Sequence, residues 1–301
     1  IMTLLKPEVH RVNYPWTENR YFYTQNGFNG TPNSNESYLL LSRYDGDLKE
    51  GIVELVDLTN FKVLHTWNPD IDELNELVEK YDIWKNLDRD FNDSRALLIH
   101  PKLTKDGGLL FNTSLLRKID QCSNLIFQAD LEISHHSVNT DVEGNIWIPT
   151  YIFPQSLPEE IVGRDLLEDG GTSEDGILKY SSSGEILFRK SLSQIFIDNN
   201  LENYLFGYGT HYMKDPLHLN DIQPVDFDGD YWKKGDVFLS LRNQSMIVLY
   251  RPSTNQIVWK TQGPFFNQHD VDILDDHRIS IFDNRMQKLH NNRIKVDGNN
   301  Q

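Results

Sequence analysis

Three short segments of the chain place a histidine just ahead of an expected β-strand. They are SHHSVNTD (134–141), PLHLNDIQ (216–223) and NQHDVDIL (267–274), and Arg242 lies in a fourth segment, SLRNQS. Imidazole can donate or accept a hydrogen bond or attack as a nucleophile, and a guanidinium offers a fork of donors to two oxygens. One such histidine would most often be a turn residue with a structural role. Three at equivalent positions, with an arginine, favour a site for a tetrahedral anion.

The elements that must position these residues are short strands in which apolar and polar residues alternate. Gly, Asn, Asp and Ser separate them at even spacing, which is typical of closed all-β architectures. The expected strands cover 38–45, 51–58, 62–67, 108–113, 125–130, 145–152, 176–182, 236–242, 246–251, 256–261 and 278–284.

The strands group into about five units that resemble one another, at roughly 38–68, 95–131, 133–191, 216–262 and 265–297. Four antiparallel strands per unit make a propeller blade. We therefore predict one all-β domain over 1–301, a β-propeller of six blades of which about five are visible here, the last incomplete. The first strand of each blade lies against the central channel, so the three histidine openings are expected to converge there. Helical spacing near 70–92 predicts an insertion.

Composition and charge exclude several classes of protein. The net charge is −16, and no run of Lys or Arg could follow a phosphate backbone, so nucleic acid is not an expected partner. The single cysteine, Cys122, excludes an intrachain disulfide and a Cys-based zinc site. No apolar run has the length of a membrane-spanning helix, and no signal peptide is visible in the opening IMTLLKPEVH.

Four motifs together carry a resemblance to a known family. They are HH at 135–136, HLNDI at 218–222, SLRNQ at 240–244 and QHDVDILDDHRISIFDN at 268–284. In this order, over roughly 95–297, they resemble the arylsulfotransferases, the PAPS-independent aryl-sulfate sulfotransferases. The resemblance implies a six-bladed propeller that moves a sulfuryl group from a phenolic sulfate ester to a phenol acceptor through a sulfohistidine intermediate. No metal or other cofactor is implied.

The resemblance also implies roles for the residues of the motifs. It makes His269 the nucleophile, with His218, Arg242 and one histidine of the 135–136 pair as ligands of the sulfate. We choose His136 because HHSVNTDVEGNI and QHDVDILDDHRI align at His136 and His269, although which of His135 and His136 faces the site stays open. His218 also qualifies as the acid for the departing phenolate.

The remaining assignments concern substrate contacts and location. His135, Asn220 and Asn243, which lie in the same motifs, are assigned to substrate binding. The resemblance implies a periplasmic or otherwise extracytoplasmic protein. A glycan on the sequon NQS (243–245) would block the site beside Arg242, which favours a bacterial source.

Two other functions remain open on the residues alone. Three channel histidines are also a ligand set for a divalent ion in a metal-dependent hydrolase or lyase. A propeller can also serve as a non-catalytic binding platform, because a fold does not determine a function.

Overall fold

The protein is mostly β in the computed structural model, which describes residues 27–28, 30–79, 81–163, 173–207, 212–288 and 294–296. The strands of the first two sheets are β1 (Tyr38–Asp45), β2 (Glu50–Asp57), β3 (Lys62–Trp67), β4 (Ile99–Leu103), β5 (Leu109–Asn112), β6 (Leu116–Ile119) and β7 (Leu125–Ala129). The strands of the next two sheets are β8 (Asn139–Thr140), β9 (Ile146–Tyr151), β10 (Asp175–Tyr180), β11 (Ile186–Ser191), β12 (Leu219–Pro224), β13 (Val237–Leu241), β14 (Met246–Arg251) and β15 (Gln256–Gln262). The last strands are β16 (His269–Ile273), β17 (Ile279–Phe282), β18 (Met286–Lys288) and β19 (Ile294–Val296).

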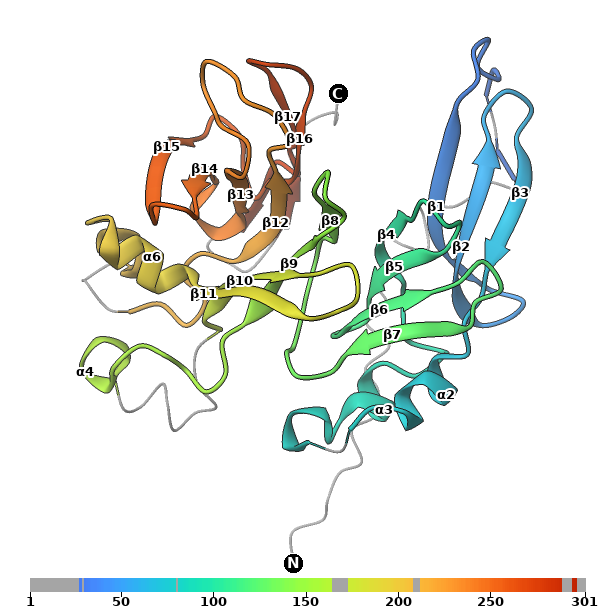
Figure 1. Ribbon diagram of the computed structural model, residues 1–301, viewed down its shortest axis with the longest axis horizontal. Helices are drawn as coiled ribbons and strands as arrows, with labels where there is room; N and C mark the ends of the chain where they lie inside the picture. The colour runs from blue at the N-terminus through green and yellow to red at the C-terminus, as the bar shows by residue number, and fades with distance from the viewer. Residues whose placement is uncertain are drawn as a thin grey trace, which may run out of the picture.

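Within each sheet the strands follow one another in chain order and pair antiparallel. Three sheets have four strands (β4 to β7, β8 to β11, β12 to β15), and β1 to β3 form a three-stranded sheet. Figure 1 shows the sheets succeeding one another along an arc, with β4, β8, β12 and β16 toward its centre and β3, β7 and β15 at its rim. This is the arrangement of propeller blades. The predicted all-β propeller with four-stranded antiparallel blades is confirmed, whereas the number of blades in the ring stays a prediction.

The core lies between neighbouring sheets, because strand residues alternate between two faces and both faces are buried. In β13, Val237 and Leu239 pack with Trp147 of the preceding sheet. Between them, Phe238 points to the other face and packs with Val271 of β16. Burying a side chain of this size is worth about 1.5–3 kcal/mol. Central strands such as β13 therefore tie their sheet to both neighbours, and a single sheet alone would leave these apolar faces in water.

The connections put particular segments on one face of the ring. In an antiparallel series the chain reverses at each strand, so the segment that precedes the first strand of a sheet and the turn between its second and third strands share a face. Helices lie in both kinds of segment. Those that precede the first strand of a sheet are α2 (Ile71–Glu76), η1 (Asp82–Trp84), α3 (Leu87–Asp90), α6 (Leu192–Asp198) and η2 (Glu202–Leu205), and α4 (Glu159–Val162) lies between the second and third strands of its sheet. Asp70 caps α2 by accepting from Glu73 N, and Ser191 caps α6 by accepting from Gln194 N.

Two details differ from the expected strands. The unit expected over 265–297 is, in the described residues, two separate two-stranded sheets, β16 with β17 and β18 with β19. In the four-stranded sheets, β4 and β6 were not expected, and the strand expected after His136 is shorter than predicted. In β4 the chain contains Pro101, and its pairing with β5 shifts register between Ile99 and Lys102. The four residues of β6 include the buried Arg117, which interrupts the apolar pattern, and β8, the strand after His136, has only two residues.

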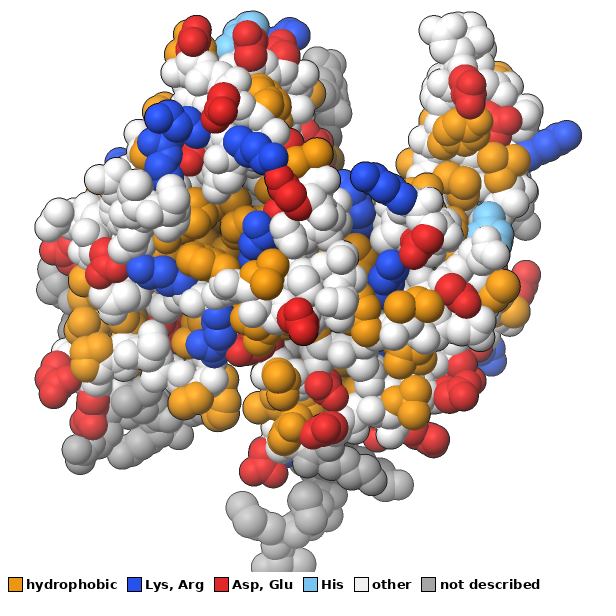
Figure 2. Space-filling view, in the orientation of Figure 1, with side chains coloured by type: hydrophobic (Ala, Val, Ile, Leu, Met, Phe, Trp, Pro, Cys, Tyr) orange, Lys and Arg blue, Asp and Glu red, His pale blue; other side chains and the backbone are white. Residues whose placement is uncertain are grey.

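The surface shown in Figure 2 carries acidic and basic side chains interspersed with exposed apolar ones. In the described part of the chain, no helix is long and apolar enough to cross a membrane. Neither observation distinguishes between the functions left open above, which must be decided at the site.

Candidate active site

The strand topology places the predicted site residues on the same face. His135 and His136 precede β8, His218 precedes β12, and His269 opens β16. Arg242 begins η4 (Arg242–Gln244), the turn between the second and third strands of its sheet. All these residues therefore lie on the face of the ring where the inner strands begin. The backbone order alone therefore brings together residues that are far apart in the sequence.

The side chains meet around His136. Its ring centroid lies 5.1 Å from that of His135, 5.1 Å from that of His218 and 5.9 Å from that of His269. Three separate sheet openings thus contribute to one cluster of imidazoles. Burial and the neighbouring histidines lower the pKa of His136 to about 3, so this ring is neutral over the physiological range.

A fourth opening, which the sequence analysis did not include, belongs to the same cluster. His100 in β4 is half-buried, and its charge would lower the pKa values of His136 and His269, which places it close to both. His100, His136 and His218 all have a left-handed backbone, with φ of 46°, 58° and 57°. A non-glycine residue in this region is strained by about 1–3 kcal/mol, and such strain concentrates at functional sites. The segment LIHPKL opens the unit 95–131 and would have revealed His100 by the same alignment.

His269 is held through its Nδ1 atom. This atom lies 3.1 Å from the carbonyl oxygen of Asn267 and 2.9 Å from Nδ2 of Asn284. The Asn267 carbonyl can only accept, so one tautomer of His269 carries its proton on Nδ1 and has a free lone pair on Nε2. In the other tautomer Nδ1 accepts from Asn284, and the proton is on Nε2. Burial first, and then the nearby charge of Arg242, lower the pKa of His269. The ring is therefore neutral near pH 7 and can act as a nucleophile.

Arg242 is half-buried and keeps most of its fork free. Its Nη1 donates to Oδ1 of Asn243 at 3.0 Å, and no carboxylate in the described ranges forms an ion pair with it. Its backbone carbonyl accepts from Asn267 Nδ2 at 3.1 Å, and Asn243 Nδ2 donates to the Asp215 carbonyl at 2.8 Å. A guanidinium oriented by Asn243, with no counter-ion among the described residues, suits an incoming anion.

His218 forms a pair with a carboxylate that sequence reasoning missed. Its Nδ1 lies 2.6 Å from Oδ2 of Asp215, three residues earlier in the segment DPLH. The carboxylate holds the proton on Nδ1, so Nε2 is the atom left to exchange a proton with a ligand. The spacing is visible in the sequence, but only the turn before β12 bends Asp215 back onto the ring.

His135 lies behind His136 and has a different set of partners. Its ring stacks on Tyr151 with centroids 4.2 Å apart and 28° between planes. Its Nδ1 is 2.8 Å from Nδ1 of His136, and its Nε2 is 3.4 Å from Oδ1 of Asp175, a buried carboxylate whose Oδ2 accepts from Leu219 N at 2.9 Å. Burial and nearby carboxylates raise the pKa of Tyr151 to about 12, so its hydroxyl stays neutral. Of the two adjacent histidines, His136 is the one that faces His218 and His269.

Buried polar residues next to the histidines hold the strands of the site together. Asn220 is 1% exposed and donates through Nδ2 to the carbonyl of Gln268 at 2.7 Å, directly before His269. Asp221 is fully buried and accepts from Asn139 Nδ2 at 2.9 Å and from Val271 N at 2.8 Å. Burial raises the pKa of Asp221 to about 7. These bonds join the strands β8, β12 and β16 and fix the relative positions of the histidine openings.

Among the described residues, the site histidines are not part of a group of three side chains close enough together to bind one metal ion. The one group of three whose ligand atoms all lie within 4.8 Å of one another, in the part of the chain that the structure describes, is Asp275, Asp276 and His277. It lies in the turn between β16 and β17, on the other face of the ring by strand order, and two of its three residues are exposed.

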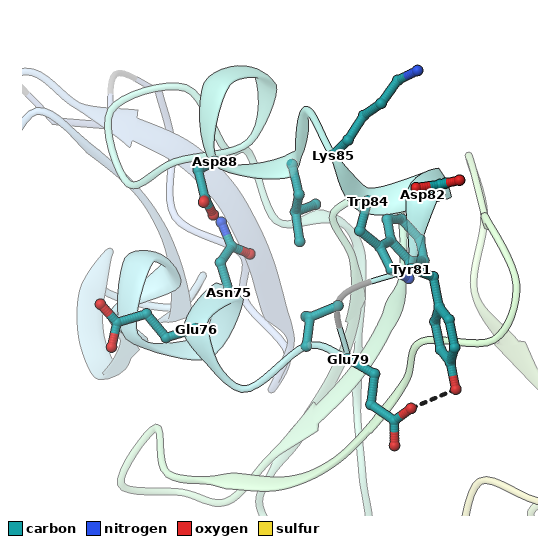
Figure 3. A pocket seen from close by; sticks show the side chains of 10 residues that line it. Asn75, Glu76, Glu79, Tyr81, Asp82, Trp84, Lys85 and Asp88 are labelled. Atoms are coloured by element: carbon teal, nitrogen blue, oxygen red, sulfur yellow. Dashed lines mark hydrogen bonds between the residues drawn. The ribbon is translucent and has the colours of Figure 1, made fainter.

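A separate pocket of about 620 Å³ lies beside the helical insertion. Figure 3 shows Glu76, Glu79 and Asp82 around it, with the Tyr81 hydroxyl bonded to Glu79. None of the five site histidines lines it. Its acidic lining does not suit an anionic substrate, and the candidate active site remains the histidine cluster.

The fold and the site together define a β-propeller in which histidines that precede or begin the inner strands meet around His136. Arg242 lies beside them and has no carboxylate partner in the described ranges. A family model for arylsulfotransferase (ASST) matches residues 100–300. The chain belongs to this family, as its motifs predicted. Membership supports an arylsulfotransferase-type function and small-molecule substrates.

Solved structures give only weak likenesses, and no curated protein matches the chain. A protein of unknown function from Bacteroides caccae has a TM-score of 0.47 and 11% identity, with 87% of this chain and 72% of that chain covered. The β-propeller domain of Cps50 (Swd1) from Myceliophteria thermophila has a TM-score of 0.42 and 8% identity, covering 87% and 65%. The propeller domain of Doa1 has a TM-score of 0.38 and 10% identity, covering 85% and 67%. The fold assignment rests on the sheets themselves.

Proposed function

We propose that the protein is a PAPS-independent aryl-sulfate sulfotransferase that works by a ping-pong mechanism. A phenolic sulfate ester gives its sulfuryl group to His269, and a phenol acceptor then removes it. The observation that carries this proposal is the meeting of His136, His218 and His269 from three sheets beside Arg242, which has no ion-pair partner among the described residues. Family membership supports the same reaction class.

In the first half-reaction, Nε2 of His269 attacks sulfur, the N–S bond forms and the S–O bond to the aryl group breaks. The reactive tautomer is the one in which Nδ1 donates its proton to the Asn267 carbonyl. That proton must stay on Nδ1 in the intermediate, because Nε2 is then sulfated and the ring is cationic. The carbonyl of Asn267 therefore stabilises both the nucleophile and the covalent intermediate, and one difficult transfer becomes two easier ones.

The departing aryl oxygen needs a proton, and His218 is placed to give it. Asp215 stabilises the imidazolium of His218 through the 2.6 Å contact to Nδ1, so Nε2 can donate. In the second half-reaction, neutral His218 takes the proton of the acceptor phenol while the acceptor oxygen bonds to sulfur and the N–S bond breaks. The protonation states return to their starting point, and general acid–base help of this kind is worth about 10²–10⁴-fold.

The transferred group is held by cationic and neutral donors. Sulfuryl transfer is chemically similar to phosphoryl transfer, whose transition state is loose, so positioning and charge stabilisation dominate. Arg242 can contact two sulfuryl oxygens with its fork, and His136 and His100 add imidazole donors at the ring centre. The neutral state of His136 suits a donor that must not repel the cationic intermediate.

The substrate-binding assignments of His135, Asn220 and Asn243 stay predictions. In the structure Asn243 orients Arg242, and Asn220 supports the backbone before His269 through Nδ2 while its Oδ1 has no hydrogen-bond partner in the described region. These contacts favour a role in positioning. We also propose an extracytoplasmic, bacterial setting, which family membership and the sequon beside Arg242 support.

The test is incubation with p-nitrophenyl sulfate, with and without a phenol acceptor, while nitrophenolate release and intact protein mass are followed together. We expect acceptor-dependent release, and a protein mass that rises by one sulfuryl group when the acceptor is left out. Release without any adduct, unaffected by the acceptor, would point to a hydrolase. A folded protein that gives neither release nor adduct would contradict the proposal and favour a binding platform.

A further inference from the structure

His135 and His136 share a proton arrangement that the surrounding groups restrict. The two Nδ1 atoms are 2.8 Å apart, so one proton, and only one, lies between them. The outer nitrogen of His135 faces Oδ1 of Asp175 at 3.4 Å and has no hydrogen-bond partner in the described region. The outer nitrogen of His136 has no protein partner among those residues and faces the cluster. The partners of these nitrogens therefore decide where the protons of the two rings lie: between the two Nδ1 atoms, on His135 Nε2, or on His136 Nε2.

Asp175 requires a proton on the outer nitrogen of His135. The carboxylate is 3% exposed and its Oδ2 already accepts from the Leu219 amide, so Oδ1 is the oxygen that faces the ring. A bare imidazole lone pair against this buried oxygen would be repulsive. In an uncharged pair, the proton on His135 Nε2 leaves His135 Nδ1 as the acceptor, so His136 donates through Nδ1 and its Nε2 is bare.

An anion bound at the cluster makes the opposite demand on His136. A sulfuryl oxygen needs Nε2–H as a donor, and this forces His136 Nδ1 to accept from His135 Nδ1–H. Asp175 still holds the proton on His135 Nε2. The two rings then carry three protons instead of two, and the added charge resides on His135, next to the carboxylate.

We propose, on the basis of the sulfotransferase function above, that Asp175 and His135 form a positioning pair that couples binding of the sulfate group to uptake of one proton. His135 becomes an imidazolium paired with Asp175 and holds His136 as a donor to the sulfuryl oxygens. The net bond changes are one proton taken from solvent onto the pair and one hydrogen bond formed from His136 Nε2 to the ligand. No oxidant or co-reactant is needed.

The neighbouring groups support placing the charge on His135. His136 is a poor place for it, since burial and the adjacent histidines hold its pKa near 3. Tyr151, stacked on His135, stays neutral because its pKa is raised to about 12. The other titratable or charged groups at the cluster are His100 with Asp270 near it, His269, Arg242, the pair of His218 with Asp215, and the buried Asp221, whose pKa is raised to about 7.

The experiment measures proton uptake without turnover. The probe is 4-nitrobenzenesulfonate, whose sulfur is bonded to carbon and cannot be transferred, titrated calorimetrically from pH 6 to 9 in two buffers of different ionisation enthalpy. We expect uptake to approach one proton per sulfonate as pH rises. His135→Gln keeps a hydrogen-bonding side chain but cannot be protonated, so it should bind about tenfold more weakly with no uptake.

Two further variants complete the design. In Asp175→Asn the imidazolium of His135 loses its carboxylate, so sulfonate binding should begin to weaken at a lower pH. The same variant should raise KM for p-nitrophenyl sulfate far more than it lowers kcat. Asp236→Asn is the matched control, since Asp236 is another buried carboxylate but is paired with Arg251 on the opposite side of its sheet from the histidines. It should leave uptake at one proton even if it lowers stability.

The outcomes separate the coupling from the reaction. Transfer activity with no proton uptake at any pH overturns the coupling alone, as does full uptake that persists in His135→Gln and so belongs to another group at the cluster. Uptake of one proton, lost in His135→Gln, without any sulfuryl transfer overturns the proposed reaction and keeps the coupling. A folded protein that binds no sulfonate overturns both.

Discussion

Two arginines of this protein occupy opposite kinds of surroundings. Arg242, at the histidine cluster, is half-buried and bonds one neutral acceptor, Asn243 Oδ1. Arg117, in β6 beneath the helical insertion, is fully buried and bonds three: Asn75 Oδ1 at 2.7 Å, Thr113 Oγ1 at 2.7 Å and Gln128 Oε1 at 3.2 Å.

The difference separates a structural cation from one available to a ligand. Neither arginine has a carboxylate partner among the described residues, and burial lowers the pKa of Arg117 to about 10. For Arg117 the neighbouring oxygens compensate for lost water, and the fork joins β6 to α2 through Asn75. For Arg242 the fork is held in place but left largely unsatisfied. A buried arginine whose donors are bonded to neighbouring oxygens supports the fold, whereas an oriented arginine with free donors indicates a binding site.

The largest effect expected at the cluster follows from His269→Ala. Removal of the nucleophile should abolish the sulfuryl adduct and lower acceptor-dependent release by on the order of 10⁴-fold or more. His65→Ala is the control, since His65 lies in an outer strand and contacts the Gln121 carbonyl. Intact mass and nitrophenolate release provide the measurement. A His269→Ala protein that still gains the adduct would assign the nucleophile elsewhere.

The same substitution at the two arginines sharpens the comparison directly. Arg242→Lys replaces a fork with a point charge and should lower kcat/KM by about 10²–10³-fold with little change in stability. Arg117→Lys should leave Asn75 or Gln128 without a donor and lower the free energy of unfolding by about 3 kcal/mol, with little change in the activity of the folded protein. Denaturant unfolding and steady-state kinetics test both. A loss of stability in Arg242→Lys and a loss of activity in Arg117→Lys would refute the distinction between a ligand-binding and a structural arginine.

A smaller effect is expected from His100, the member of the cluster that sequence analysis missed. His100→Leu, which keeps a side chain of similar size but has no donor, should raise KM for p-nitrophenyl sulfate about tenfold, because one neutral hydrogen bond of ~1.4 kcal/mol is lost. The stability change should be slight, since the ring has no hydrogen-bond partner in the described region. A variant with unchanged KM and kcat would place His100 outside the substrate site.

The pH dependence tests the electrostatics of the cluster. Because burial and Arg242 lower the pKa of His269, its neutral form persists below the ordinary value of 6.5, and adduct formation should hold its plateau there before it falls. Single-turnover mass measurements from pH 8 down to 4 would show this. A rate already half lost at pH 6.5 would contradict it.

The lowered pKa of His136 also affects stability. The unfolded chain binds a proton to this ring below about pH 6.5, whereas the folded chain does so only near pH 3. Stability from this residue is therefore fully present above 6.5 and is lost as the pH falls toward 3. Circular dichroism over the same pH range separates unfolding from titration of His269.

Much of the fold was predictable because its signals are local. Alternation in segments such as MIVLYR, with turn residues between them, fixes strands whose two faces are both buried, and the repeated units predict blades. β4 and β6 were missed because Pro101 and a register shift interrupt the pattern of the first, and Arg117 interrupts that of the second. The openings at His136, His218 and His269 were found because they recur at equivalent places in the units.

The partners of these residues were not predictable, because they depend on how segments distant in sequence pack. Asp175 reaches His135 from the strand after a long connection, and Asn284 reaches His269 from beyond β17.

The sequence by itself determined which residue types stand where the inner strands begin. The two-residue period of the strands and the repetition of the units are properties of the residue order alone. The tertiary structure alone decided which nitrogen of each histidine is engaged, which arginine keeps its donors free and which carboxylates face the cluster. The physical reason is that hydrogen bonding and burial depend on distances of a few ångströms between sheets, and these are set only when the sheets pack against one another.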